Sequence, residues 1–220
     1  MIDTPAAHSW SKWPRLKEVL GLNKILYVLI ASDFIILSAY GFLSPVFAIF
    51  LTDRIIGGTL IVVGISEAIY LATKSIFQIP FSILIDKTEG ERIDFWFLFA
   101  GSVIMSGSLF LYLFVSLPWH IYLISLIYGL GNALADSSWS GLFTRNIIRD
   151  RESFAWSFSS TVVDLGEAGA AVIGAIIAQF LGFDKLFVIV GSVSLVGTFL
   201  LFLFYRELRG IQKEKDIKNS

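Results

Sequence analysis

Long apolar runs with few charges make up most of the chain, and short polar segments containing glycine interrupt them. A run of 19 uncharged residues lies between Asp33 and Asp53, and one of 20 lies between Lys185 and Arg206. Because an α-helix rises about 1.5 Å per residue, roughly 20 mostly apolar residues cross the hydrocarbon core of a bilayer. The pattern therefore predicts membrane-spanning helices.

The longest uncharged run has 41 residues between Asp94 and Asp136, which is too long for one crossing. It contains a polar break around Pro118, so we expect two helices joined by a tight turn. The other apolar segments hold isolated charges but keep the length of a span. We predict an all-α membrane protein, a bundle of six transmembrane helices with spans at 24–51, 58–85, 93–117, 119–143, 154–181 and 186–205.

Composition supports the same class of protein. The chain is 55% hydrophobic and only 16% charged, whereas soluble domains are about 45–50% apolar and about 25% charged. Twenty Phe and six Trp in 220 residues exceed what a small soluble core can bury, so a lipid-facing surface is expected. The absence of Cys excludes disulfides, Cys-ligated metals and thiol catalysis. A net charge of −1 does not favour nucleic acid as a partner.

Basic residues lie almost entirely on one side of the six-span arrangement. Of the 17 Lys and Arg residues, fourteen fall in the two terminal segments and the two loops of that side, only Arg54 and Lys185 fall on the other, and Lys74 lies inside a span. Cytoplasmic segments carry such an excess. We therefore expect a multi-pass protein of the cell membrane with a cytoplasmic N-terminal segment at 1–23, without a cleavable signal, and a cytoplasmic tail at 207–220.

Charges inside the spans are distributed unevenly. The interiors of the third and sixth spans contain none, whereas the first, second, fourth and fifth contain polar stripes at helical spacing. Ionisable residues within a membrane are costly and suggest function by default. We expect these four spans to surround a polar cavity and the third and sixth to face lipid. The candidates for a transport path are Asp33, Tyr40, Glu67, Lys74, Gln78, Asn132, Asp136, Asp164 and Glu167. For any one acid, a structural or interfacial role stands as an alternative.

The segment between the second and third spans, Pro80 to Arg92, resembles the cytoplasmic signature of the major facilitator superfamily. That signature reads Gly-x-x-x-Asp-Arg/Lys-x-Gly-Arg/Lys. Gly129-Leu130-Gly131 and the Gly/Ala-rich fifth span are also similar to this family. The resemblance implies a cytoplasmic latch formed by Pro80, Asp86, Lys87, Gly90 and Arg92. The segment departs from the pattern in three ways: Ser82 replaces the first Gly, one extra residue separates Asp86 from Gly90, and Glu91 stands where a base is usual.

Members of this family normally have twelve spans in two halves of six, with the cavity between the halves. The resemblance implies one half here, a single six-helix bundle that pairs as a homodimer or with a companion half. It implies a secondary active transporter that moves a small polar solute by alternating access. The excess of acids within the spans favours a cationic solute or proton coupling, and sodium coupling is also open. No cofactor and no metal are expected.

Two other hypotheses remain open. The chain is alternatively a membrane scaffold or accessory subunit without transport, or a truncated piece of a twelve-span transporter. An intramembrane enzyme is not expected, because His8 precedes the first span and His120 lies at an outer turn. Neither histidine can therefore activate a serine within the membrane.

Overall fold

The computed structural model describes residues 24–87 and 90–219, and this part of the chain is helical without a β-strand. The all-α class predicted from sequence is confirmed, and the predicted segment 1–23 lies outside the described residues. The elements are α2 (Lys24–Gly41), α3 (Phe47–Arg54), α4 (Leu60–Lys87), α5 (Glu91–Leu111), the 3₁₀ turn η1 (Tyr112–Phe114), α6 (Pro118–Asn146), α7 (Glu152–Leu181) and α8 (Phe183–Asn219). The expected count of six is not exact, since seven α-helices occur in the described residues.

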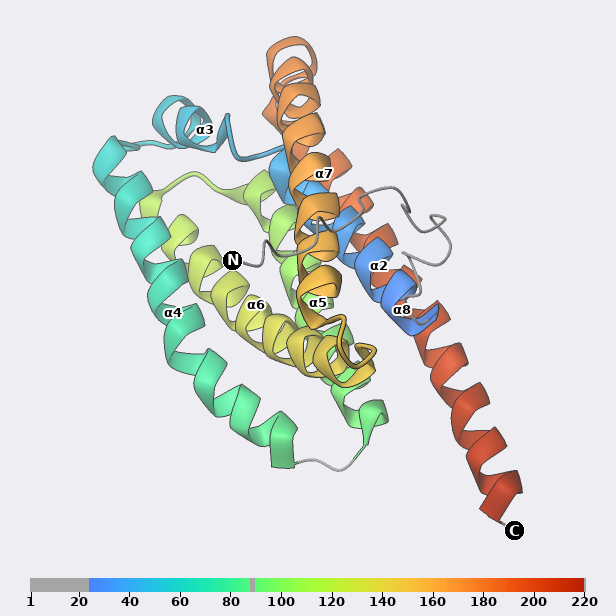
Figure 1. The fold of residues 1–220 in the computed structure, drawn as a ribbon. Helices are drawn as coiled ribbons and strands as arrows, with labels where there is room; N and C mark the ends of the chain where they lie inside the picture. Colours follow the sequence, from blue (N-terminus) through green and yellow to red (C-terminus); the bar gives the residue numbers. More distant parts are fainter. Residues whose placement is uncertain (1–23, 88–89, 220) are drawn as a thin grey trace, which may run out of the picture.

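The additional helix arises because the first apolar segment is divided. α2 ends at Gly41, and a run of turns leads to α3 at Phe47. Pro45 lies in this turn, and a proline lacks the amide hydrogen that a continuous helix requires. α3 then packs near the start of α4, at one end of the bundle (Figure 1).

Four helical stretches of the described residues are long and apolar enough to cross a membrane. They are Leu60–Lys87, Glu91–Phe114, Glu152–Leu181 and Phe183–Leu203. The apolar part of α2, Ile25–Gly41, is shorter. α6 has 29 residues, but its polar positions, among them Asn132 and Asp136, lower its apolar character.

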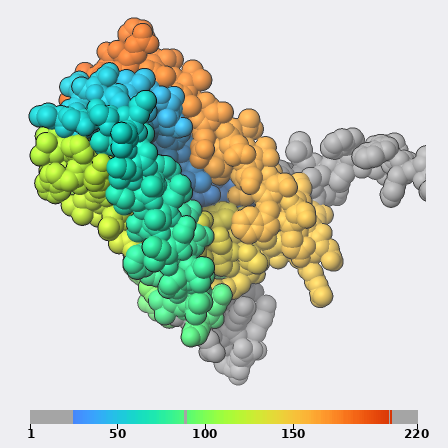
Figure 2. All heavy atoms as spheres, turned by 90° about the vertical axis from the view of Figure 1, so that its left-hand side faces the viewer, coloured from blue at the N-terminus to red at the C-terminus, as the bar shows by residue number. Residues whose placement is uncertain are grey.

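The long helices follow one another in space as α4, α6, α5, α8, α2 and α7, each packed against the next (Figure 1). At the ends of this series α4 packs mainly on α6, and α7 packs mainly on α2 with a smaller contact to α8. In the 18-residue apolar stretch of α4 or α7 only 17% of the residues are buried, against 39% for α5 and 44% for α8. Figure 2 shows α4 and α7 on either side of a hollow, with α2 at its floor.

Glycines allow α2 and α7 to approach closely. A Cβ atom added at Gly41 would lie 2.8 Å from the Cα atom of Glu167. One added at Gly174 would overlap the backbone carbonyl of Phe42. The small residues of the fifth predicted span therefore bring two backbones together, as small residues do at many membrane helix contacts.

Uncharged hydrogen bonds join α5 to α8. The buried Ser106 hydroxyl lies 2.7 Å from that of Ser194 and 3.1 Å from that of Thr198. The expectation for these helices, the third and sixth spans, was a lipid-facing role. These two helices are packed more fully within the chain than α4 and α7, but Trp96, Val196 and Phe199 on them stay exposed. The lipid-facing role of α5 and α8 therefore stays a prediction.

Candidate functional site

An ion pair links α4 to α6 within the polar face of the bundle. The Nζ atom of Lys74 lies 3.1 Å from Oδ2 of Asp136, and Nε2 of Gln78 donates a hydrogen bond of 3.1 Å to the same oxygen. Lys74 and Gln78 are four residues apart, so both project from one side of α4. The side chains of Lys74 and Asp136 are 26% and 38% exposed, so both charged groups are partly accessible at the surface of the described chain.

A cavity of about 170 Å³ adjoins this pair, and we call it the charged cavity. Its lining includes the polar residues Ser32, Asp33, Lys74, Ser102, Asn132, Asp136 and Trp139. The carboxylate of Asp33 has those of Asp136 and Glu167 as electrostatic neighbours. Asp33 of α2 and Asp136 of α6 thus line the charged cavity together with Lys74 of α4, and Glu167 of α7 interacts electrostatically with Asp33.

Two buried polar atoms at the charged cavity have no hydrogen-bond partner among the described residues. They are Oδ1 of Asn132, an acceptor, and Nε1 of Trp139, a donor. Buried polar atoms are nearly always satisfied in folded proteins. The charged cavity therefore offers a carboxylate, an ammonium group, an acceptor and a donor to a small polar molecule.

A second, larger cavity of about 310 Å³ lies between α2, α4, η1 and α6, and we call it the tyrosine cavity. Tyr40, Tyr70, Tyr112 and Tyr128 line it together with Glu67. The ring centroids of Tyr40 and Tyr128 are 4.8 Å apart, and those of Tyr70 and Tyr128 are 5.2 Å apart. Residues from four elements therefore form one aromatic enclosure.

The structure brings together most of the predicted path residues. Asp33, Lys74, Asn132 and Asp136 line the charged cavity, and Gln78 holds Asp136. Two further candidates, Tyr40 and Glu67, line the tyrosine cavity instead. The charge of Glu167 interacts with that of Asp33. Asp164 lines neither cavity and is exposed on α7. No single path through all nine residues is visible, and their roles in transport stay predictions.

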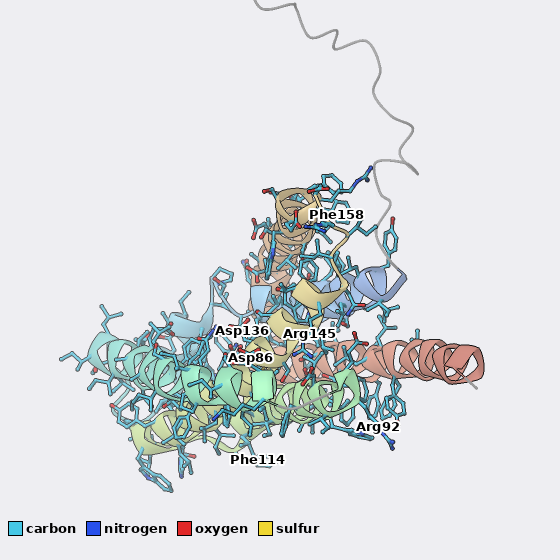
Figure 3. All side chains as sticks on the ribbon, turned by 60° about the horizontal axis from the view of Figure 1, so that its bottom comes forward. Asp86, Arg92, Phe114, Asp136, Arg145 and Phe158 are labelled. Atoms are coloured by element: carbon cyan, nitrogen blue, oxygen red, sulfur yellow. The ribbon has the colours of Figure 1, made fainter. Side chains whose placement is uncertain are left out.

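The predicted latch residues lie at the opposite end of α4 from Glu67. Pro80 is exposed within α4, Asp86 and Lys87 are exposed at its end, and Gly90 has a φ of 129° before α5. Figure 3 shows Asp86 where α4 ends and Arg92 on the first turn of α5. No hydrogen bond or ion pair joins these five residues to one another in the described part of the chain. The latch role stays a prediction.

Sequence reasoning missed an ion pair between α5 and α6. Nη1 of Arg145 lies 2.6 Å from Oδ2 of Asp94, whose side chain is fully buried. Asn146 also donates a 3.4 Å hydrogen bond to Glu91. A signal was present, since Asp94 lies in the first turn of α5 and Arg145 in the last turn of α6, where helix dipoles favour these charges. That signal explains why each charge lies at a helix end, but it does not indicate that the two residues pair with each other.

The fold and the site together define a class of protein. Long apolar helices pack side by side, and the charged residues Asp33, Lys74 and Asp136 line a cavity between them. This arrangement defines a multi-pass membrane protein with a polar interior face.

The family model of the Major Facilitator Superfamily matches residues 29–219, and the chain belongs to that superfamily of membrane transporters. The resemblance noted around Asp86 is thereby confirmed at the level of the family. No curated protein matches the chain.

Proposed function

We propose that this chain is one half of a secondary active transporter that moves a small polar solute by alternating access. The observation that carries the proposal is the Lys74–Asp136 pair, which lies with Asp33 beside a cavity at the hollow face between α4 and α7. Charged groups between membrane-spanning helices are retained at a cost, and they mark substrate or ion pathways in membrane proteins. Coupling of the solute to protons or sodium ions fits the acids around Lys74.

A second six-helix half completes this arrangement. Lipid does not satisfy polar side chains, and each unsatisfied group in hydrocarbon costs several kcal/mol. The open face of α4 and α7 therefore needs protein or a water-filled cavity in front of it. We propose that a second copy or a companion half covers this face, with both termini of this chain in the cytoplasm and the assembly in the cell membrane.

The arrangement of the ion pair suits a two-state device. Asp136 accepts from both Lys74 and Gln78, so a solute or proton that reaches Asp136 competes with groups on α4. Release of Lys74 from Asp136 removes one polar link between α4 and α6, while the hydrogen bond between Ser82 and Ser137 remains. A site formed where two bundles meet can then open to one side or the other as one bundle rocks against its partner.

Alternating access is testable by chemical labelling because the natural chain has no cysteine. One cysteine is introduced at Ser44, which lines the tyrosine cavity, or at Phe81, nearer the other end of α4. A membrane-impermeant thiol reagent is applied from each side of sealed vesicles. We expect reaction from opposite sides, and we expect that labelling at position 44 slows labelling at position 81 in the double variant. Independent labelling at both positions contradicts alternating access and favours a non-transporting accessory subunit.

Assembly is tested with a second pair of cysteine variants. Leu71 is 49% exposed and lies on the stripe of Glu67 and Lys74, whereas Val196 is 60% exposed on α8. Leu71→Cys is expected to form a disulfide-linked dimer, or a crosslink to a companion chain, in native membranes. Val196→Cys serves as the matched control and is expected to react far less. A chain that is strictly monomeric in lipid refutes the two-half proposal.

A further inference from the structure

The tyrosine cavity has the chemistry of a site for an organic cation. It is separate from the Lys74–Asp136 pair, and its lining residues are Tyr40, Leu43, Ser44, Phe47, Ser66, Glu67, Tyr70, Leu109, Tyr112, Ser125 and Tyr128. None of these described lining residues is Lys, Arg or His. The cavity thus combines one acid with five aromatic rings and lacks a basic group that could hold an anion.

The aromatic rings are arranged at angles to one another. The planes of Tyr40 and Tyr128 meet at 52°, and those of Tyr70 and Tyr128 meet at 42°. Tyr112 continues the wall through an edge-on contact with Phe47, whose centroid lies 5.4 Å away. Rings inclined in this way enclose a space from several directions. A cation within about 6 Å of a tyrosine face is attracted by the negative face of the ring.

Glu67 provides the charge for such a ligand. Its side chain is exposed, and it forms no ion pair or hydrogen bond with the described residues. Lys74, the basic residue of the same stripe, lies about 10.5 Å further along the helix axis and is bound to Asp136. Glu67 is therefore an acid in a membrane helix whose counter-charge the described chain does not supply.

The size of the cavity also suits a small ligand. Its volume of about 310 Å³ is at the lower end of the range of about 300–1,000 Å³ for small-molecule pockets. Quaternary ammonium groups combine a positive charge with an apolar methyl surface. They are the cations that aromatic enclosures recognise best, because they shed water easily and make van der Waals contact with each ring.

We propose that the tyrosine cavity binds a small alkylammonium cation, with Glu67 as counter-charge and Tyr40, Tyr70, Tyr112 and Tyr128 as the aromatic enclosure. The cation is then the solute, or one class of solute, of the transporter. That last assignment rests on the proposed function. The binding site itself does not, since binding is measurable without flux.

The test uses the purified protein in lipid nanodiscs, with choline as probe and 3,3-dimethylbutan-1-ol as its neutral isostere. Calorimetric titration is expected to show saturable binding of choline at least tenfold tighter than that of the alcohol. Glu67→Gln should weaken choline binding at least tenfold. Asp184→Asn, which removes an exposed acid of α8 outside the cavity, should leave it unchanged. The comparison of choline with the neutral alcohol uses the wild-type chain alone, so it does not depend on the folding of any variant.

A second set of variants tests the aromatic contribution. Tyr70→Leu should weaken choline binding about fivefold or more, and Tyr70→Phe should restore it because the ring is retained. Equal affinity for choline and the neutral alcohol, or unchanged choline binding in Glu67→Gln, overturns the cation site. Choline binding in a chain that fails the double-cysteine test refutes alternating access and leaves the site in place. A chain that passes that test without binding choline loses only the cation site.

Discussion

Helices α4 and α7 differ from α5 and α8 in how the chain holds them. α5 and α8 have buried fractions of 39% and 44% in their apolar stretches, and neutral hydroxyls close the contact between them. α4 and α7 have buried fractions of 17%, and charged side chains line the hollow beside them. The chain's own core therefore stabilises α5 and α8, whereas α4 and α7 keep a larger exposed surface. Polar side chains thus join two helices between α5 and α8, whereas beside α4 and α7 they line an accessible cavity.

The two ion pairs follow the same division. Asp94 is fully buried where it meets Arg145 of α6, whereas Asp136 is 38% exposed where it meets Lys74. Breaking a buried pair by removing one partner is strongly destabilising, because the remaining charge has lost both water and its counter-ion. Exposed pairs contribute little to stability. Similar chemistry is thus expected to have a structural consequence at one end and a functional one at the hollow.

The largest expected effect on stability is at the pair that contains the buried Asp94, whose partner Arg145 has a side chain 36% exposed. Arg145→Met removes the guanidinium from a carboxylate with no exposed surface and should lower the free energy of unfolding by about 3 kcal/mol. Thermal unfolding in detergent measures the change. Arg149→Met is the matched control, an exposed arginine of the same end, and should change stability by less than about 0.5 kcal/mol. Equal stabilities of the two variants contradict a structural role for the Asp94–Arg145 pair.

The close contact of α7 with α2 gives the next largest effect. A side chain at Gly174 would overlap the Phe42 carbonyl, so Gly174→Val should cost about 2 kcal/mol by forcing the helices apart. Gly169→Val on the same helix is the control, since a Cβ there meets no atom within 4 Å. Thermal unfolding compares the two variants. If they are equally stable, α7 is held by contacts other than this one.

Much of this division was visible in the sequence, and the reasons for the remainder are physical. Helical class and the polar stripe of Lys74 and Gln78 follow from local periodicity, which needs no knowledge of neighbours. The break at Pro45 also has a local signal, but this residue lies inside a single predicted span, 24–51. The Asp94–Arg145 pair joins residues 51 positions apart, so only the packing of α5 on α6 reveals it. The division of the polar face into two cavities likewise depends on how four helices meet.

A smaller effect is expected at the neutral contact of α5 with α8. Ser106→Ala leaves the buried Ser194 hydroxyl without this partner, while Thr198 keeps its bond of 3.0 Å to the Ser194 carbonyl. Hydrogen bonds between membrane helices contribute about 0.6 kcal/mol on average, so a loss of about 1 kcal/mol is expected. Ser108→Ala is the control, because that hydroxyl bonds to the carbonyl of Met105 in its own helix. If Ser106→Ala lowers the free energy of unfolding as much as Arg145→Met does, the hydroxyl contact between α5 and α8 contributes more than one hydrogen bond of ordinary strength.

The smallest expected effect on stability is at the hollow, where the effect on function should be greatest. Lys74→Met removes a pair whose side chains are both partly exposed, and Asp136 keeps its hydrogen bond from Gln78. The change in unfolding free energy should stay below about 1 kcal/mol. In the labelling assay, however, reagent bound at position 44 should no longer slow the reaction at position 81. The reason is that α4 has lost its ion pair with α6, which the proposed transport cycle breaks and re-forms. The double variant with Asp136→Asn shows whether the two residues act as one unit, since their effects should then not add. If Lys74→Met destabilises the protein as much as Arg145→Met, the α4–α6 contact is structural, and the contrast between the open and the closed region of the bundle is wrong.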